Sequence, residues 1–484
     1  MLVISKYPHD ASLAARARVV GDVVFKENDD AAALQRLYAE AAAVQPPEGA
    51  APHAAAPCCL LLQSAALVHH IQTQGLPEQV TRAFDVVALT PYDLLAMQLL
   101  VPLQGATWTC TPLDREPISR DSETTVHLVL LGFGHMAQAL ALHAALVAHY
   151  PNYCRDNRLR TRITVIGDDV AAERDAFVQR YEPLFEHAWH RTLHLHDAQP
   201  TLTLHKPRYE GQRKDFVDVE WEFVHANLQH DVVRRKLGEW ARSPRQLLTL
   251  ALCSDQTALN TEAAWALPRE VWEHRIPVLC YTHDSTLPQL AIDNGACPTL
   301  RPFGLPDCNP AVLPPLLRMA QCVNYVYDHC FSLPQDAPIT APAIIDTARL
   351  QPLWHALQSV TKQYSNLYHA MTLQSKLHSV GHDTAGADDY LALSADEIAV
   401  LTEVEHNRWS VEELILGYRP PTDEEMARVE ADITLKRALR KQMVHYDLRA
   451  FDDLRRDATG KNVQVYDQAL VQGMPLILRT CTTN

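Results

Sequence analysis

Apolar residues in the central part of the chain form short continuous runs, separated by segments with helical periodicity. The runs lie at 126–131, 163–166, 218–223, 246–252 and 276–281. A strand that is buried on both faces is apolar throughout, and these runs have the length of strands. The segments 232–241 and 257–274 repeat their apolar residues at helix spacing instead. The alternation predicts an α/β fold with a doubly wound parallel Rossmann-type sheet over residues 120–305.

The first 115 residues show the same alternation in an incomplete form. Apolar runs at 59–62 and 85–89 predict buried strands, and 18–22 predicts a strand that ends in a Gly-Asp turn. Residues 30–43 have a helical pattern, and the alanine- and proline-rich stretch 45–57 is typical of a surface loop. Because no glycine-rich phosphate loop occurs here, we expect a degenerate Rossmann-like α/β half-domain that is structural or forms a dimer interface.

The last third of the chain has helical periodicity. Residues 306–350 are rich in proline around one amphipathic segment, 315–331, and are expected to bridge two ligand-binding parts. The apolar residues of that segment form a predicted docking stripe: Leu316, Met319, Val323 and Val326. Residues 351–484 are expected to form an all-α domain, the last of four consecutive parts.

Size and charge narrow the function classes. The chain has 484 residues, enough for two to four domains, and its formal net charge of −15 argues against a general nucleic-acid surface. No apolar run approaches the roughly 18 residues of a membrane helix, and the start of the chain lacks the apolar segment of a signal peptide. The eleven scattered cysteines favour a reducing compartment over a disulfide framework. We therefore expect a cytoplasmic protein without direct membrane insertion.

Histidine is abundant, with 24 residues, and four of them are clustered: His187, His190, His194 and His196. No cysteine or acidic residue completes a familiar metal-ligand spacing with them. We therefore expect histidines that are partly buried or exposed at the surface, and no metal site.

A G-x-G-x-x-A motif follows the run at 126–131 and opens a long apolar helix. In this context Gly132 makes the tight turn, Gly134 lets a pyrophosphate approach the backbone, and Ala137 lets the helix pack on the strand. The first N–H groups of the helix have no partner within it and attract phosphate. The motif predicts NAD or a related adenine dinucleotide at the loop. Its residues are Gly132, Phe133, Gly134, His135 and Met136. The alternative is a fold of this type whose site is vestigial.

Two further loops are expected at the same edge of the sheet. Asp168 and Asp169 follow the second strand, where a carboxylate binds ribose hydroxyls and favours NAD over a 2′-phosphate. Their distance from the glycine loop exceeds the usual ~20 residues because of a polar insert at 151–162, and a Gly-Asp pair also occurs simply as a turn. Ser254 and Asp255 follow the fourth strand, at the end where such sheets bind ligands.

A polar cluster lies in the helical C-terminal part. Its residues are Glu405, His406, Asn407, Arg408 and Trp409, and apolar residues at helix spacing flank them. Charge, a forked hydrogen-bond donor and an aromatic plane suit a nucleotide-sized ligand. The alternative is a surface helix whose tryptophan docks into the core and whose charged residues are solvated. General-base catalysis by His406 beside Glu405 is disfavoured, because consecutive helix residues point about 100° apart.

The cluster is part of a longer pattern. The pattern continues after the cluster at Glu412, Leu416, Gly417, 435–436, 445–448, 452–454 and 474–478. Before the cluster it includes Trp354, Ser365, Asn366, Ala370 and 376–377. In this order and spacing they resemble the RyR domain of ryanodine receptors and its bacterial relatives, over about residues 350–480. The resemblance implies a nucleotide-like ligand with Trp409 as its stacking surface. The other ligand-binding residues would be Glu405, His406, Arg408, Tyr418, Ser365 and Asn366. Tyr418 departs from the receptor repeats, which usually have tryptophan there.

The segment that contains the glycine loop is similar to the NAD-binding domain of potassium-uptake regulators. The shared features are the loop, an acid after the second strand, and a run such as 259–264. A class of bacterial proteins joins this domain to a C-terminal RyR domain, and the chain resembles a full-length member. The resemblance implies a role in nucleotide signalling or phage defence.

Binding is a better explanation of these motifs than catalysis. The sequence contains no nucleophile elbow, no zinc-protease motif and no P-loop lysine. We expect a cytosolic sensor, a homo-oligomer such as a dimer, that binds a dinucleotide in the Rossmann-type domain and a nucleotide-derived ligand in the RyR-like domain. Two alternatives remain open: an NAD(P)-dependent or NAD-consuming enzyme, and a soluble regulatory subunit of a cation transporter.

Overall fold

The computed structural model describes most of the chain. It covers residues 2–4, 23–26, 29–43, 55–102, 113–168, 170–195, 200–207, 215–334, 337–357, 359–382, 392–454 and 462–482. The chain divides into two compact units. Unit 1 comprises Met1–Leu95, Cys308–Met371 and Gly473–Asn484, and unit 2 comprises Ala96–Asp307 and Thr372–Gln472. Each unit therefore combines segments that are far apart in the sequence, whereas the sequence pattern predicts four consecutive domains.

Unit 2 contains an eight-stranded sheet. Across the sheet the strands are β12 (Leu300–Phe303), β11 (Val278–Tyr281), β10 (Gln246–Leu252), β5 (Thr125–Leu131), β6 (Thr161–Gly167), β9 (Val219–His225), β7 (Trp189–His194) and β8 (Thr201–His205). All neighbours are parallel except β7 and β8. In this sheet the first strand along the sequence is β5. The next strands, β6 to β9, lie on one side of β5, and the last three, β10 to β12, lie on its other side. Such a reversal leaves a crevice at the carboxyl ends of two neighbouring strands.

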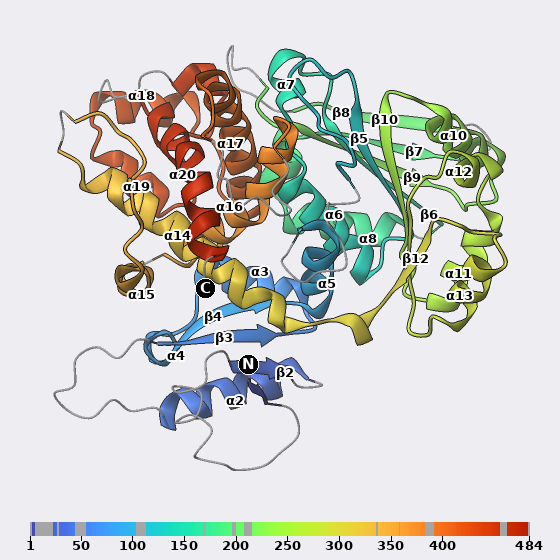
Figure 1. The fold of residues 1–484 in the computed structure, drawn as a ribbon, viewed down its shortest axis with the longest axis horizontal. Helices are drawn as coiled ribbons and strands as arrows, with labels where there is room; N and C mark the ends of the chain where they lie inside the picture. Colours follow the sequence, from blue (N-terminus) through green and yellow to red (C-terminus); the bar gives the residue numbers. More distant parts are fainter. Residues whose placement is uncertain are drawn as a thin grey trace. The chain divides into compact units, whose positions relative to one another are not determined.

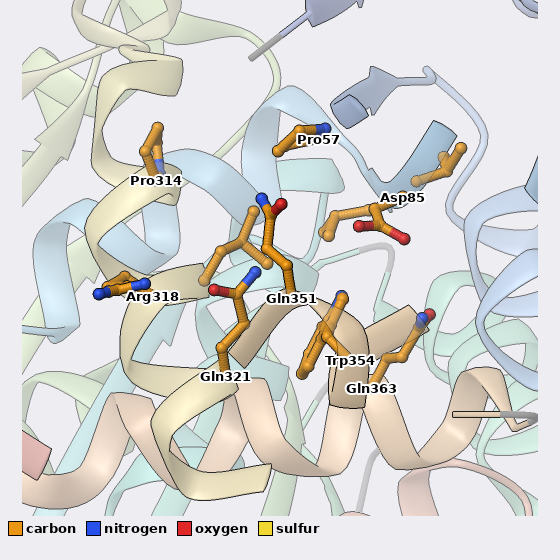
Figure 2. Close-up of a pocket in the computed structure, with 11 residues that line it drawn as sticks. Pro57, Asp85, Pro314, Arg318, Gln321, Gln351, Trp354 and Gln363 are labelled. Atoms are coloured by element: carbon orange, nitrogen blue, oxygen red, sulfur yellow. The ribbon is translucent and has the colours of Figure 1, made fainter. Parts of the chain in front are cut away.

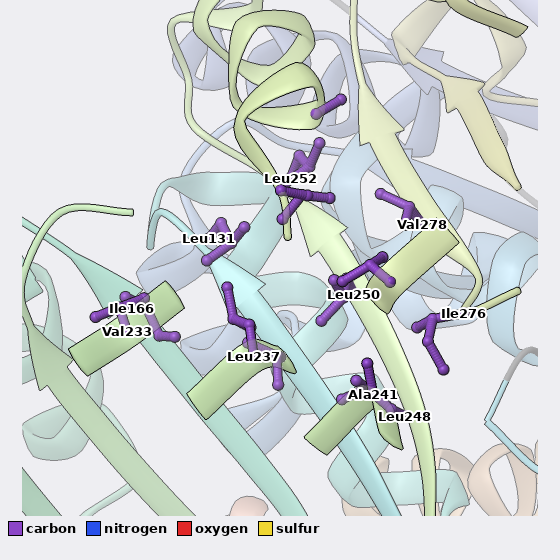
Figure 3. Close-up of a cluster of buried hydrophobic side chains, with 14 of the residues drawn as sticks. Leu131, Ile166, Val233, Leu237, Ala241, Leu248, Leu250, Leu252, Ile276 and Val278 are labelled. Atoms are coloured by element: carbon purple, nitrogen blue, oxygen red, sulfur yellow. The ribbon is translucent and has the colours of Figure 1, made fainter. Parts of the chain in front are cut away.

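Helices cover both faces of this sheet (Figure 1). They are α6 (His135–Val147), α7 (Pro151–Arg155), α8 (Val170–Arg180), α9 (Glu182–His187), α10 (Asp231–Arg242), α11 (Thr257–Ala266), α12 (Arg269–Glu273) and α13 (Thr286–Asp293). On one face, Leu237 of α10 packs with Leu250 of β10 in a large apolar cluster (Figure 3). On the other face, Phe133 lies edge to face with Phe177 and Phe223, at ring centroid distances of 5.1 and 5.8 Å.

The predicted α/β class with a mostly parallel sheet is confirmed. The five predicted central strands correspond to β5, β6, β9, β10 and β11, and β10 has the predicted bounds. The helix predicted at 257–274 is two helices, α11 and α12, because the extended residues before Arg269 include Pro268, which cannot donate a helical hydrogen bond. The sequence pattern did not predict β7, β8 or β12.

Further helices complete unit 2. The helix α17 (Ala395–Ile415) begins at Ser394 with a capping box, in which Ser394 and Glu397 each bind the other's backbone N–H. It contacts α6, α7 and α9. The shorter helices α18 (Asp423–Ala431) and α19 (Leu435–Arg440) follow it. Within the described residues 392–454, the backbone pairing outside helices is an isolated bridge between Arg419 and Val444.

Unit 1 contains a four-stranded parallel sheet. Its strands lie in sequence order: β1 (Leu2–Ile4), β2 (Val23–Lys26), β3 (Ala56–Leu61) and β4 (Phe84–Leu89). The helices α2 (Asp30–Ala43), α3 (Ala65–Gln74) and α4 (Glu78–Ala83) accompany them, and α5 (Pro91–Leu100) follows β4. Leu37, Leu60 and Val68 lie in the core between sheet and helices. The strand predicted at 18–22 lies outside the described residues, as does most of the loop predicted at 45–57.

Four later helices contribute residues to unit 1: α14 (Leu313–Ser332), α15 (Leu350–His355), α16 (Val360–Ser379) and α20 (Gln464–Thr482). The stripe predicted on α14 is largely buried at Leu316, Val323 and Val326. The Tyr364 hydroxyl donates to the carbonyl oxygen of Ala88 at 3.1 Å and accepts from its N–H at 2.8 Å. Since β4 is an edge strand, this side chain satisfies backbone groups that an edge leaves unpaired.

Short 3-10 turns occur at Leu305–Asp307, Pro310–Val312, Thr347–Arg349 and Phe451–Leu454. None of the helices in the described part of the chain combines the length and the apolar character needed to cross a bilayer.

Candidate functional site

The glycine loop lies where the strand order of unit 2 reverses. Gly132 follows β5 with a φ of +91°, a left-handed conformation that favours glycine. Its N–H donates to the carbonyl oxygen of Ile166 in β6, at 2.8 Å. A Cβ at Gly132 would lie only 2.9 Å from the backbone nitrogen of Ser254, after β10. Glycine is therefore required here by the backbone, and it places the loop between the ends of β6 and β10.

Gly134 caps the N-terminus of α6, and a carboxylate lies directly over it. Its φ of −68° is open to any residue, and it offers no side chain to the helix. A Cβ at Gly134 would collide with the Asp255 carboxylate. That carboxylate accepts a hydrogen bond from His135 Nδ1 at 3.1 Å, and both side chains are at least half exposed. Asp255 thus occupies the position at the helix N-terminus that an anionic ligand group would take.

The remaining residues predicted for this site are distributed between the same edge and the core. Asp168 is exposed on the turn after β6, next to Gly167, whose Cβ position lies 3.7 Å from the Cα of Gly132. Asp169 lies outside the described residues. Phe133 and Met136 are buried, so only their backbones face the loop. The structure therefore brings Gly132, Gly134, His135, Asp168, Ser254 and Asp255 to one edge of the sheet.

Asn260 holds the loop after β10 and is a residue that the site prediction omitted. Its side-chain oxygen accepts from the Ser254 N–H at 2.9 Å, and its amide donates to the carbonyl oxygens of Ser254 and Tyr281. Only 2% of the residue is exposed. An asparagine eight residues after the strand was the available signal, because a buried amide needs backbone partners.

The polar cluster of α17 forms a buried ion network. All three guanidinium nitrogens of Arg408 donate to carboxylates, Nε and Nη2 to Glu405 and Nη1 to Glu412. Lys376 of α16 pairs with Glu405 and donates to Thr372 at 2.9 Å. The four charged side chains are each at most 2% exposed. Glu405 and Arg408 therefore bind each other, and Glu405 also binds Lys376 of the neighbouring helix.

Burial changes the proton affinities of this network. Burial lowers the pKa of Lys376 to about 8, although Glu405 opposes the change. Burial also lowers the pKa of Arg408, but its two carboxylate partners more than compensate and hold it above its usual value. Glu413 lies beside the network with 2% exposure, and burial raises its pKa to about 8. Glu413 is therefore mostly protonated at neutral pH.

The aromatic residues predicted around the ligand form a small cluster. The half-buried Trp409 contacts the ring of His445 edge to face at 4.8 Å, and Tyr418 contacts the same ring edge to face at 5.9 Å. His406 is 1% exposed, and its ring nitrogens face the carbonyl oxygen of Arg449 at 2.7 Å and Asp467 at 3.4 Å. Of the predicted residues of α17, Trp409 has the most exposed surface for a ligand.

Ser365 and Asn366, which the resemblance places in the same site, lie in the part of α16 that belongs to unit 1. Both are half-buried, and the Asn366 amide donates to the side-chain oxygen of Asn324 in α14, at 3.4 Å. The sequence pattern gave no reason to place this asparagine pair within unit 1.

A cavity of about 500 Å³ lies at the opposite edge of the large sheet, where β5, β6 and β10 begin. Four arginines line it: Arg155, Arg158, Arg162 and Arg245. Each is paired with a carboxylate, of Asp121, Asp156, Glu220 and Glu123 respectively. These ion pairs neutralise most of the positive charge, so the cavity carries less attraction for anions than its arginines suggest.

No group of three or more histidine, cysteine, aspartate or glutamate side chains in the described residues is arranged to hold a metal ion. The predicted histidine cluster lies partly on β7, where His190 stacks on His205 at 4.3 Å and His194 stacks on His225 at 4.2 Å. Comparison of the chain with models of protein families, with curated proteins and with solved structures finds no match.

Proposed function

We propose that unit 2 binds an adenine dinucleotide such as NAD at the glycine loop, and that the sheet is of the Rossmann type. One observation carries this proposal: a left-handed glycine connects β5 to the N-terminus of α6 at the point where the strand order reverses between β5 and β10. Parallel sheets bind nucleotides at such reversals, with the pyrophosphate at the helix N-terminus. The exposed Asp168 after β6 is the candidate ribose ligand.

Asp255 must move for a pyrophosphate to reach Gly134. An exposed carboxylate at a helix N-terminus contributes roughly 0.3–1 kcal/mol, and the Asp255 side chain is half exposed. Displacement therefore costs at most about a fivefold loss of affinity, since 1.4 kcal/mol corresponds to tenfold. The carboxylate competes with the ligand without blocking the site.

Isothermal titration of the full chain with NAD, NADP, ATP and ADP-ribose tests this proposal. Gly134→Val should abolish binding and leave the fold intact, because the φ of Gly134 suits any residue and the nearest obstacle is the flexible Asp255 side chain. Asp255→Asn should tighten binding by up to about fivefold. Absence of binding by all four ligands at millimolar concentration would show that the loop is vestigial.

We further propose a regulatory role, in which a nucleotide-derived ligand binds near α17. Glu405 and Arg408 are engaged in the ion network, so the ligand would contact chiefly the half-buried Trp409 and the aromatic cluster beside it. Stacking of a base on an aromatic ring contributes roughly 1–3 kcal/mol.

The second site can be tested independently of the first. Trp409→Ala should lower the affinity of this site for a nucleotide by about tenfold to a hundredfold. Trp409→Phe, which keeps an aromatic ring, should retain part of that affinity. Dinucleotide binding that depends on Gly134 should be unchanged in both variants. Equal affinity of wild type and Trp409→Ala for every nucleotide tested would remove the second site from the proposal.

A further inference from the structure

Unit 1 contains a cavity of about 190 Å³ between its sheet and three of its helices (Figure 2). The helix α14 presents one face to it, with Pro314, Leu317, Arg318 and Gln321 at positions i, i+3, i+4 and i+7. Pro57 and Asp85 are paired neighbours on β3 and β4 and line the other side. Trp354 of α15 and Gln363 of α16 complete the lining. The cavity is thus built from segments that only the fold of this unit brings together.

Two polar groups in this lining are buried and lack a full set of partners. Gln321 is 8% exposed, and its amide makes no hydrogen bond to any described residue. Asp85 accepts a hydrogen bond from His355 Nδ1 at 2.9 Å through one oxygen. Its other oxygen is buried without a hydrogen-bond partner in the described part of the chain. Buried polar groups are nearly always hydrogen-bonded, so each exception needs an explanation, and a bound ligand is one.

We propose that this cavity binds a single planar heterocycle with hydrogen-bond donors and acceptors on its edge, the chemistry of a free nucleobase. An amide offers both a donor and an acceptor, and a carboxylate offers acceptors. Gln321 and Asp85 together match an edge that carries both kinds of group. The remaining walls are largely apolar and suit the faces of a ring: Pro57, Val86, Val87, Pro314, Leu317 and Trp354.

Size and charge restrict the ligand further. A protein cavity of about 150 Å³ admits benzene, so this cavity has room for one ring with substituents and not for a whole nucleotide. The lining contains one carboxylate, Asp85, and one guanidinium, Arg318. These charges balance, which favours a neutral ligand. Gln351 and Gln363 supply two more amides; Gln351 is exposed at the rim.

The test uses the full chain and the free bases adenine, guanine, hypoxanthine, cytosine and uracil, with binding measured by titration calorimetry. We expect at least one base to bind to the wild type. Gln321→Leu should lower the affinity for that base about tenfold, because a polar group of the base would be buried against the leucine side chain without a hydrogen-bond partner. Asp85→Asn keeps the size of the side chain and should change which base binds best, because it replaces an acceptor by a donor.

Two controls separate this site from others. Gln35→Leu, on the exposed face of α2 in the same unit, should leave base binding unchanged. Gly134→Val should also leave it unchanged, whereas a base bound at the glycine loop would be lost. The inference is overturned if no base binds to folded wild-type protein, in which case the cavity holds only water. It is also overturned if Gln321→Leu and Asp85→Asn both bind the bases as the wild type does.

Discussion

The buried carboxyl group of Glu413 should make unit 2 less stable as the pH rises. Burial raises its pKa from 4.5 to about 8, against an opposing effect of Arg440, and Glu412 adds to the increase. One carboxyl oxygen has no hydrogen-bond partner among the described residues. The folded state therefore keeps a proton that the unfolded state releases near its ordinary pKa. The contribution of this group is fully present below pH 4.5 and is lost as the pH rises to about 8.

The magnitude follows from the width of that window. Each pKa unit corresponds to roughly 1.4 kcal/mol, so the loss between pH 4.5 and pH 8 is of the order of 5 kcal/mol. Gln in place of Glu413 has nearly the same shape and does not titrate. The Glu413→Gln variant should match the wild type near pH 4.5 and become progressively more stable than it up to pH 8.

The assay is the free energy of unfolding by urea at intervals between pH 4.5 and pH 8, for variant and wild type together. Burial raises the pKa of Asp114 to about 7, so this group titrates in the same pH range. Because Asp114 is present in both proteins, the difference between their two stability curves isolates the contribution of Glu413. Above pH 8 the buried Lys376 begins to lose its proton, which acts in the opposite direction. Glu424→Gln, on the exposed surface of α18, controls for the loss of a charge. A pH-independent difference between Glu413→Gln and wild type would refute the reasoning.

Three other features of the structure give predictions that separate measurements can check. Gly132→Ala should destabilise the protein by roughly 1–2 kcal/mol or more in chemical denaturation, because a left-handed residue acquires a Cβ. Arg408→Met should cost roughly 3–5 kcal/mol in the same assay, since it removes the guanidinium that pairs with both Glu405 and Glu412 in a buried network. The thiols of Cys322 and Cys481 lie 3.8 Å apart, so oxidised glutathione should cross-link them, as peptide mass spectrometry would show, and Cys322→Ser should prevent it. Unchanged stability in either variant, or an absent cross-link, would contradict the corresponding geometry.

The large sheet could be predicted from the sequence because burial on both faces leaves a direct trace. The run at 246–252 is apolar where β10 forms, and the strand has those bounds. The β7–β8 hairpin leaves no such trace. All five residues of β8 are exposed, and β7 carries histidine and arginine side chains, so neither strand is an apolar run.

The arrangement of segments within the units could not be read from periodicity. The stripe on α14 indicates correctly that one face of the helix is buried. Periodicity does not say which segment covers that face. In unit 1, Val326 lies against α20, where a Cβ on Gly473 would be 3.2 Å away, nearly 150 residues further along the chain. A contact of this kind depends on tertiary packing alone.

The polar cluster of α17 illustrates the same limit at a candidate site. The helix brings Glu405, Arg408 and Glu412 close together, at positions i, i+3 and i+7. The sequence favoured either a ligand site or a solvated surface for them, whereas the structure buries them as an ion network. Burial results from the packing of α17 on α6, α7 and α9, and the fourth charge comes from Lys376 on another helix. Sequence spacing gives the neighbours of a charged side chain but not its exposure to solvent.

Asp255 shows that a carboxylate of the chain itself can lie where the glycine motif predicts an anionic ligand group. The first N–H groups of α6 attract any negative charge, including one from the chain itself, and Asp255 lies 121 residues from Gly134. A ligand must therefore gain more from the helix than the carboxylate does. A singly charged group gains about as much as Asp255 loses, so its net affinity from this contact is close to zero. A pyrophosphate carries more charge and more acceptor oxygens, so it retains a surplus. Under the proposed function, the tethered carboxylate would therefore favour pyrophosphate over weaker anions at this loop.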